Sequence, residues 1–190
     1  MLFRSISIAS GISTEQASLL GGSPGSVFAV DGQSNTRFFN SSLTKKITEN
    51  TWVAGSYNLG YTTLSGQKNS LVDGLQDLRS DSWSMGIVKT KNFNDADQIG
   101  FAISQPMVVS GGTMDLTIPL GLNENGSMIF QHRMIDMKSS IVERNYELNY
   151  FTPLSEESTL SLSGLVRTNP GNIESSKVDG IIAARVTKYF

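Results

Sequence analysis

Residues 177–190 read KVDGIIAARVTKYF, and alternate positions in this stretch differ in character. Counting back in twos from Phe190 gives a mostly apolar set with one charge, namely Lys188, Val186, Ala184, Ile182, Gly180 and Val178. The intervening set, from Tyr189 back to Asp179, is mixed in polarity. A period of two residues is that of a β-strand, whose side chains point alternately to opposite faces. The stretch therefore predicts a strand with one dry face, and the fold depends on what that face touches.

The same alternation recurs through residues 51–190 and predicts about eight strands. Around Tyr57, for example, Val53 and Leu59 would share its face, while Ser56 and Asn58 would lie on the other. Clusters of Gly, Asn and Pro suit tight turns, and they predict turns at 110–112, at 123–126, at 168–171 and around Pro153. The pair Asn125-Gly126 predicts a type I′ turn. Short links between successive strands favour an antiparallel up-and-down meander.

Two regions are less regular. Residues 65–81 contain Leu71, Leu75 and Leu78 at helical spacing, which predicts a loop with a short helix. Residues 1–50 are interpreted as N-terminal strands of the same sheet or as a linker from an upstream domain. The expected organisation is one domain overall, with the eight-strand antiparallel β-domain over residues 51–190.

The composition is low in charge. Of the 190 residues, 38% are apolar or aromatic and 17% are charged, while 18 are Gly. This composition is typical of a barrel whose outer face meets lipid and whose inner face carries small polar side chains. The net charge of −2 gives no basic footprint for nucleic acid, and the absence of Cys excludes disulfides and thiolate metal sites. No apolar run reaches the length of about 18 residues that a transmembrane helix needs.

Two architectures fit such strands, a soluble β-sandwich and a membrane β-barrel. The small polar faces favour a closed outer-membrane-type barrel of about 8–12 strands. Aromatic residues on the apolar faces are typical of the girdles of such barrels, and the expected membrane-facing residues are Tyr57, Tyr61, Trp83, Phe101, Tyr146 and Tyr150. Pro106 and Pro119 would then need bulges or strand ends, because proline cannot donate to a ladder. Arg144 and Lys188 would need to lie near an interface.

No catalytic motif stands out in the sequence. The single histidine, His132, is expected to be an ordinary strand residue, and neither a GxSxG elbow nor a Walker loop occurs. The acidic residues Glu143, Glu147 and Asp115 are expected to pair with arginines such as Arg133 or Arg167, and the segment 94–97 is expected to be a solvated turn. We therefore predict no enzyme activity in this chain and no cofactor.

Four stretches together resemble the C-terminal region of the autotransporter-like subtilisin-like serine peptidases of Gram-negative bacteria. They are SDSWSMGIVKT (80–90), IGFAISQPMVVSGGTMDLTIPLG (99–121), YELNYFTPL (146–154) and VRTNPGN (166–172). The resemblance implies a non-catalytic translocator or outer-membrane anchor, with a protease passenger upstream. The catalytic serine motif of the protease has no counterpart here, because residues 111–114 lack the serine.

The resemblance also implies a set of partners and a location. The final residues Val186, Tyr189 and Phe190 would be a signal read by the outer-membrane barrel assembly machinery. The other partners would be the lipid bilayer and the passenger, with no nucleic acid, and the location would be the outer membrane. Two alternatives stay open: a soluble β-sandwich accessory domain of a secreted or cell-surface protease, and a free-standing small outer-membrane barrel.

Overall fold

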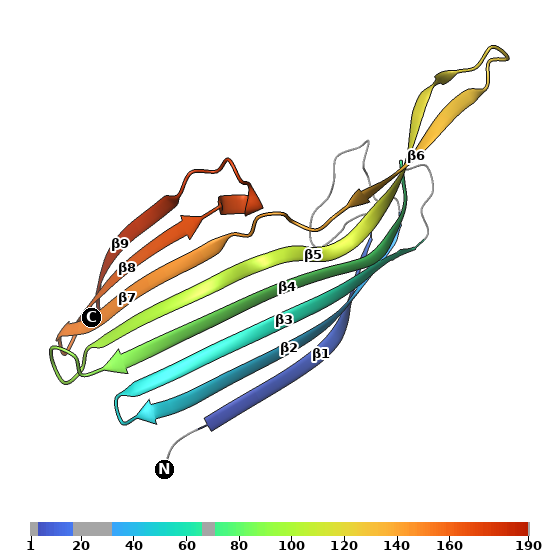
Figure 1. Cartoon of the computed structure of the whole chain (residues 1–190). Helices are drawn as coiled ribbons and strands as arrows, with labels where there is room; N and C mark the ends of the chain where they lie inside the picture. Colours follow the sequence, from blue (N-terminus) through green and yellow to red (C-terminus); the bar gives the residue numbers. More distant parts are fainter. Residues whose placement is uncertain (1–3, 17–31, 66–70, 190) are drawn as a thin grey trace.

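The computed structural model describes residues 4–16, 32–65 and 71–189. These residues form one antiparallel sheet of nine strands (Figure 1). The elements are β1 (Arg4–Gln16), β2 (Gln33–Thr48), β3 (Thr51–Ser65), β4 (Val72–Thr90), β5 (Gln98–Leu122), β6 (Met128–Asp136), β7 (Arg144–Ser155), β8 (Ser158–Thr168), the 3-10 turn η1 (Pro170–Asn172) and β9 (Asp179–Lys188). The predicted all-β antiparallel meander is confirmed.

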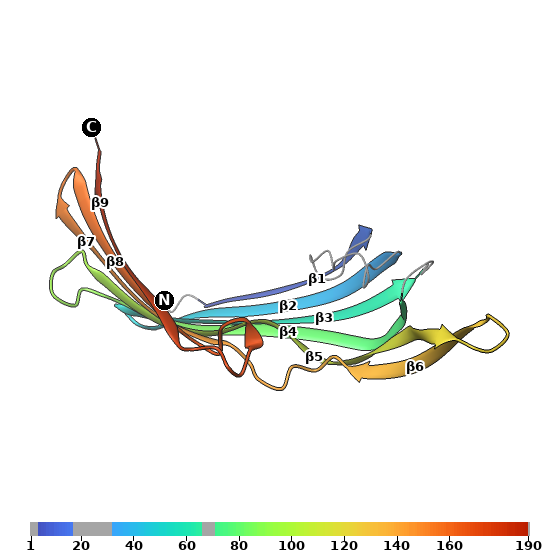
Figure 2. The same cartoon turned by 90° about the horizontal axis from the view of Figure 1, so that it is seen from above.

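The strands follow the order β1-β2-β3-β4-β5-β7-β8-β9, with β6 on a side branch. The 25-residue strand β5 pairs with β7 through residues 98–104 and with β6 through residues 113–122. The paired segments 113–122 and 128–136 form a hairpin arm, whose base at 113–116 is still paired with β4 and whose outer part projects beyond the rest of the sheet (Figures 1 and 2). The sheet curves strongly but stays open, with β1 and β9 as its edge strands, so the closed barrel is not confirmed (Figure 2).

The register divides the sheet into an apolar and a polar face, because directly paired residues share a face. One row across the strands contains Ile6, Leu43, Gly55, Met85, Ile103, Tyr146, Val166 and Gly180. The adjacent row points the other way and contains Ser7, Ser42, Ser56, Ser84, Ser104, Asn145, Arg167 and Asp179. The apolar face and the polar face, defined by these two rows, extend across all eight strands of the main path.

Cross-strand hydrogen bonds join the small side chains of the polar face. The hydroxyls of Ser56 and Ser84 are 2.8 Å apart, and Asn58 Nδ2 donates to Ser82 Oγ at 3.0 Å. Such side-chain pairs stabilise the sheet in addition to its backbone hydrogen bonds. Because the side chains on this face are small, the sheet can curl further toward it without steric clashes.

The short helix expected within residues 65–81 is wrong for the described part, because β4 begins at Val72. Leu75 pairs with Met114 and Leu78 pairs with Thr62, so these leucines are ladder residues. Asp77 has a φ of 51° at a register shift, and this bulge breaks the strict period of two. The bulge explains why the spacing of Leu75 and Leu78 resembles that of a helix. Residues 66–70 lie outside the described residues.

The turn expected at 110–112 is also wrong, because β5 runs straight through it. Gly112 has a φ of +117°, and a Cβ there would lie 2.6 Å from the Cα of Leu78. The glycine is required for a close approach between β4 and β5 rather than for a reversal of the chain.

We expect Gly112→Ala to lower the free energy of unfolding by at least about 1 kcal/mol, because alanine disfavours this φ and collides with the neighbouring strand. Denaturant titration would measure the loss. Gly74→Ala is the matched control in the same sheet, since nothing lies within 4 Å of its added Cβ. Equal effects of the two substitutions would contradict the close-approach role of Gly112.

The other predicted turns are present. The loop at 123–126 joins β5 to β6, with the N–H of Gly126 donating to the carbonyl of Asn123 at 2.9 Å. Only Gly126 has a positive φ there, so the type I′ assignment is wrong and the loop has glycine at its last position. Asn169 has a φ of 50° and precedes η1, and Pro153 lies in the ladder just before the 156–157 turn. Pro106 and Pro119 both adjoin register shifts, as expected.

The links between strands differ in length at the two ends of the sheet. Residues 49–50 and 156–157 make two-residue turns, and residues 91–97 make a seven-residue loop, at one end, here the short-turn end. The ten-residue link 169–178 lies at the opposite long-link end together with the hairpin arm. The pairs Arg4↔Lys45 and Ser158↔Lys188 bring the start of β1 and the end of β9 to the short-turn end.

Candidate membrane-facing surface

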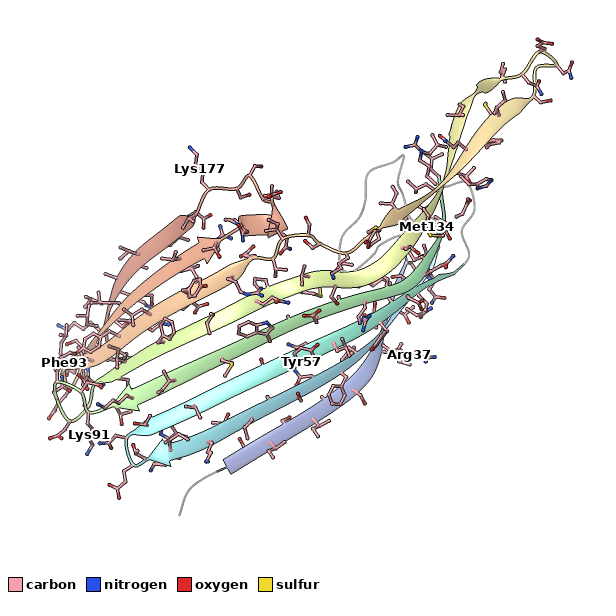
Figure 3. All side chains as sticks on the ribbon, in the orientation of Figure 1. Arg37, Tyr57, Lys91, Phe93, Met134 and Lys177 are labelled. Carbon is pink, nitrogen blue, oxygen red and sulfur yellow. The ribbon has the colours of Figure 1, made fainter. Side chains whose placement is uncertain are left out.

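All six residues predicted to face the membrane lie on the apolar face. Tyr57 pairs directly with Trp83, Tyr146 with Ile103 and Tyr150 with Ile99. Phe101 lies between Ile87 and Leu148, and Tyr61 lies between Arg37 and Arg79. Tyr61, Tyr57 and Trp83 are displaced toward the long-link end and Tyr150 toward the short-turn end, whereas Phe101 and Tyr146 lie in the middle rows. Figure 3 shows Tyr57 and Arg37 on the neighbouring strands β3 and β2.

Within the described ranges, no element covers the apolar face at any point across its width. Ile6 is 74% exposed, Met85 is 62% exposed and Ile182 is 92% exposed, so both edges and the centre are open. Further exposed side chains on this face are Ile8, Leu43, Tyr57, Ile87, Phe101, Leu148, Leu162, Val166 and Val186. A shallow hollow of about 350 Å³ lies over Gly55, between Leu43, Met85 and Phe101. Contiguous apolar surface on this scale marks a contact with lipid or protein.

Basic residues border the apolar face on both sides. At the long-link side, Arg37, Tyr61 and Arg79 form one row, and the guanidinium of Arg144 lies 5.4 Å from the centre of the Trp83 ring. At the short-turn side, Arg4 pairs with Lys45, and Lys89 pairs with Thr51. Lys89 follows Arg79 by ten residues in β4. That separation is about 33 Å along a strand and about 25 Å across a bilayer at the usual strand tilt.

The residues of the expected C-terminal signal have different positions. Val186 pairs with Leu160 on the apolar face and is exposed. The N–H of Tyr189 donates to the carbonyl of Glu157 at 2.8 Å, so the ladder continues just past β9. Phe190 lies outside the described residues.

Polar clusters have structural partners. Arg167 makes two hydrogen bonds to the carboxylate of Asp179, at 2.6 and 2.8 Å, and lies 4.0 Å from Glu143. The expected pairing of Glu143 with Arg167 is therefore confirmed. Glu143 also accepts the N–H of Gly171 at 2.7 Å, which holds the start of the β8–β9 link. Asp115 is elsewhere, bound by Gln76. In the parts of the chain that the structure describes, no three His, Cys, Asp or Glu side chains are grouped to hold a metal ion.

The lone histidine is an arm residue. His132 Nδ1 lies 2.8 Å from the hydroxyl of Thr117, and the ring is largely exposed. Thr117 in turn contacts Asp73, and Asp73 Oδ2 lies 3.6 Å from the same imidazole nitrogen. In a catalytic triad the carboxylate and the nucleophile face different nitrogens of the histidine, whereas here the hydroxyl and the carboxylate both lie at Nδ1, so the arrangement is not that of a triad.

The 94–97 turn is exposed at residues 94–96, as expected for a solvated turn, but its last residue, Asp97, is a buried carboxylate. Asp97 is fully buried and accepts the N–H groups of Asn92 and Phe93 at 2.6 and 2.8 Å. Burial acts to raise the pKa of Asp97. The two N–H groups and the hydroxyl of Tyr150 outweigh it and hold that pKa below its ordinary value of 3.8.

The lowered pKa of Asp97 predicts a stabilising effect that depends on pH. The contribution is complete above the unfolded-state pKa near 3.8 and is lost as the pH falls through the lower folded-state value. We expect Asp97→Asn to be less stable than wild type at pH 7 and the difference to vanish below that folded pKa. Denaturant titrations of both proteins from pH 7 downward would test this. A difference that persists unchanged in acid would count against the carboxylate's role.

The arginines of the long-link border were not predicted as functional residues. The sequence alone does not place these residues together, because Arg37, Tyr61 and Arg79 become neighbours only through the pairing of β2, β3 and β4. Among the described residues, no helix has the length and hydropathy to cross a bilayer.

No family model, curated protein or solved structure matches this chain. The resemblance to the tails of subtilisin-like peptidases therefore remains a prediction.

Proposed function

We propose that this chain is an outer-membrane β-domain that closes by pairing β1 with β9 and acts as the anchor or translocator of an attached passenger. The observation that carries the proposal is the uncovered apolar face, which extends over all eight strands of the main path. Its width between basic borders suits the apolar band of a membrane barrel, about 25 Å tall. Aromatic side chains lie next to the long-link border, as in an interfacial girdle.

If the apolar face contacts lipid, as this proposal states, the sheet has to close. An open sheet edge leaves backbone groups without partners, and hydrocarbon cannot supply them. The main path has eight strands in alternating directions, so β1 and β9 run antiparallel and can form a ladder. Closing the sheet with the apolar face outward turns the polar face inward, and its serines and glycines need little room there.

The arrangement of the links supports the same proposal. Outer-membrane barrels have short turns on the periplasmic side and longer loops outside. Here both two-residue turns, 49–50 and 156–157, lie at one end, together with the start of β1 and the end of β9, whereas the ten-residue link 169–178 and the hairpin arm lie at the other. The short-turn end is therefore assigned to the periplasm, and the hairpin arm to the cell exterior.

The alternatives differ in what they require. A soluble sandwich needs a second sheet over the apolar face, and the described strands all belong to one sheet. A free-standing barrel shares the membrane fold and differs only in having no passenger. The assignment of a subtilisin-like protease as passenger rests on the resemblance of residues 80–90, 99–121, 146–154 and 166–172, and the assembly machinery as partner rests on it as well.

A fusion experiment tests the anchor function. A reporter protein with a secretion signal would be joined to the N-terminal side of the chain and produced in a Gram-negative host. We expect the fusion in the outer-membrane fraction and the unfused reporter in the periplasm. Protease added to intact cells then separates export from anchoring, since only an exported reporter is cleaved. A soluble periplasmic fusion would contradict both roles.

A further inference from the structure

We infer that Arg37, Tyr61 and Arg79 form a binding site for the phosphate group of an anionic lipid headgroup. The inference rests on the proposed membrane function and adds a specific lipid partner to it. The three residues are consecutive in one row of the apolar face, on β2, β3 and β4. Arg37 and Arg79 lie on strands that are separated by one strand, so their backbones are about 10 Å apart. Two guanidinium groups at the ends of long side chains can bridge this gap by binding one phosphate between them.

Both guanidinium groups are available for an external anion. Arg37 and Arg79 are exposed, and the salt bridges among the described residues involve only His132 and Arg167 as cations. Arg79 extends over Gly111, whose missing side chain leaves it space: the guanidinium Nη2 lies 3.6 Å from where a Gly111 Cβ would be. The nearest acid in the next row of the face, Asp81, accepts a hydrogen bond from Gln105 Nε2 at 2.8 Å.

The surroundings of the row favour a lipid over a free anion. The next rows toward the middle of the sheet are rich in large apolar and aromatic side chains, including Phe39, Leu59, Ile8 and Tyr57. A phosphate held by the arginines would therefore leave the acyl chains of the same molecule against apolar surface. Arginine binds phosphate with two parallel hydrogen bonds, whereas lysine acts as a point charge. The short-turn border has Lys45, with Arg4 opposite it, and Lys89, but no pair of arginines that flanks a tyrosine.

The test uses the full chain refolded into vesicles of phosphatidylcholine, alone or with a minority of phosphatidic acid. The measured quantity is the temperature at which the compact, heat-sensitive gel band is lost. We expect phosphatidic acid to raise this temperature for wild type. The double variant Arg37→Gln/Arg79→Gln should need about 20-fold more phosphatidic acid for the same rise. The control Lys45→Gln/Lys89→Gln removes the same charge from the other border and should respond like wild type.

Equal losses in the two double variants would overturn the site, because attraction would then be general to basic residues. The same rise with inorganic phosphate in pure phosphatidylcholine would overturn the lipid assignment. Arg37→Lys/Arg79→Lys keeps both charges and should lose part of the effect, which guards against misfolding of the glutamine variant. Absence of a compact band in wild type would refute the proposed membrane function itself, and the lipid site with it. A compact wild-type band that phosphatidic acid leaves unchanged would refute the site alone.

Discussion

Met85→Arg is expected to lower the free energy of unfolding in lipid by about 2–4 kcal/mol, the cost of a cation at the middle of the bilayer. Met85 pairs with Gly55 and Ile103 in the central row of the apolar face and is 62% exposed. Because no side chain covers it, the arginine would cause no steric clash, and the loss would report the medium around the face. Urea titration in lipid vesicles would measure it.

The matched control is Tyr61→Arg. Tyr61 is on the same face but lies between Arg37 and Arg79 at the long-link border. The cost of a charge there should fall to about 0–1 kcal/mol, because it reaches the headgroup region. Equal costs at the two positions would mean that the face does not meet a layered apolar medium, and a protein partner would then have to cover it.

Cysteines placed in β1 and β9 are expected to cross-link when the chain closes. The row through Ile6 reaches Gly180 on β9. In a closed eight-strand barrel with tilted strands, a row that goes once around the barrel returns about eight residues away from its starting point. The partner of Ile6 is therefore about eight residues from Gly180, and β9 extends that far only toward Lys188. That shift places Ile12 opposite Ile182. The chain has no native cysteine, so Ile12→Cys/Ile182→Cys can form only the intended disulfide within one chain.

The expected readout is a compact gel band that resists boiling without reductant and opens with it. Gly180 and Ala184 are the neighbouring positions on the same face, and pairing Ile12→Cys with a cysteine at each tests a register shifted by two residues. One of the three pairs should cross-link far better than the others. Ile12→Cys with Leu148→Cys, on a strand in the middle of the sheet, should not cross-link. Failure of all three edge pairs in a folded sample would contradict closure by β1 and β9.

The sequence predicted the faces well and the connections less well. The alternation around Tyr57 and Trp83 placed both on one face, because a period of two follows directly from strand geometry. It failed wherever a bulge changes that period. The bulge at Asp77 gives Leu75 and Leu78 a helix-like spacing, and Gly112 resembles a turn glycine although it serves a contact with Leu78.

The row of Arg37, Tyr61 and Arg79 could not be predicted because it depends on register. Each residue is an ordinary strand position in its own segment, and the row exists only because β2, β3 and β4 align at those positions. A shift of one residue in either ladder would move an arginine to the polar face. The turn at Asp97 is a similar case, since the composition of residues 94–97 does not reveal that the carboxylate is buried under Tyr150.

The measurement that tests the central claim most directly is gel mobility, boiled against unboiled, after refolding in detergent and separately in plain buffer. Closure around an apolar exterior predicts a compact, fast-migrating band that forms only in detergent and disappears on boiling. A monomer that folds cooperatively in buffer without detergent would contradict the claim, because the apolar face would then be covered by the protein itself.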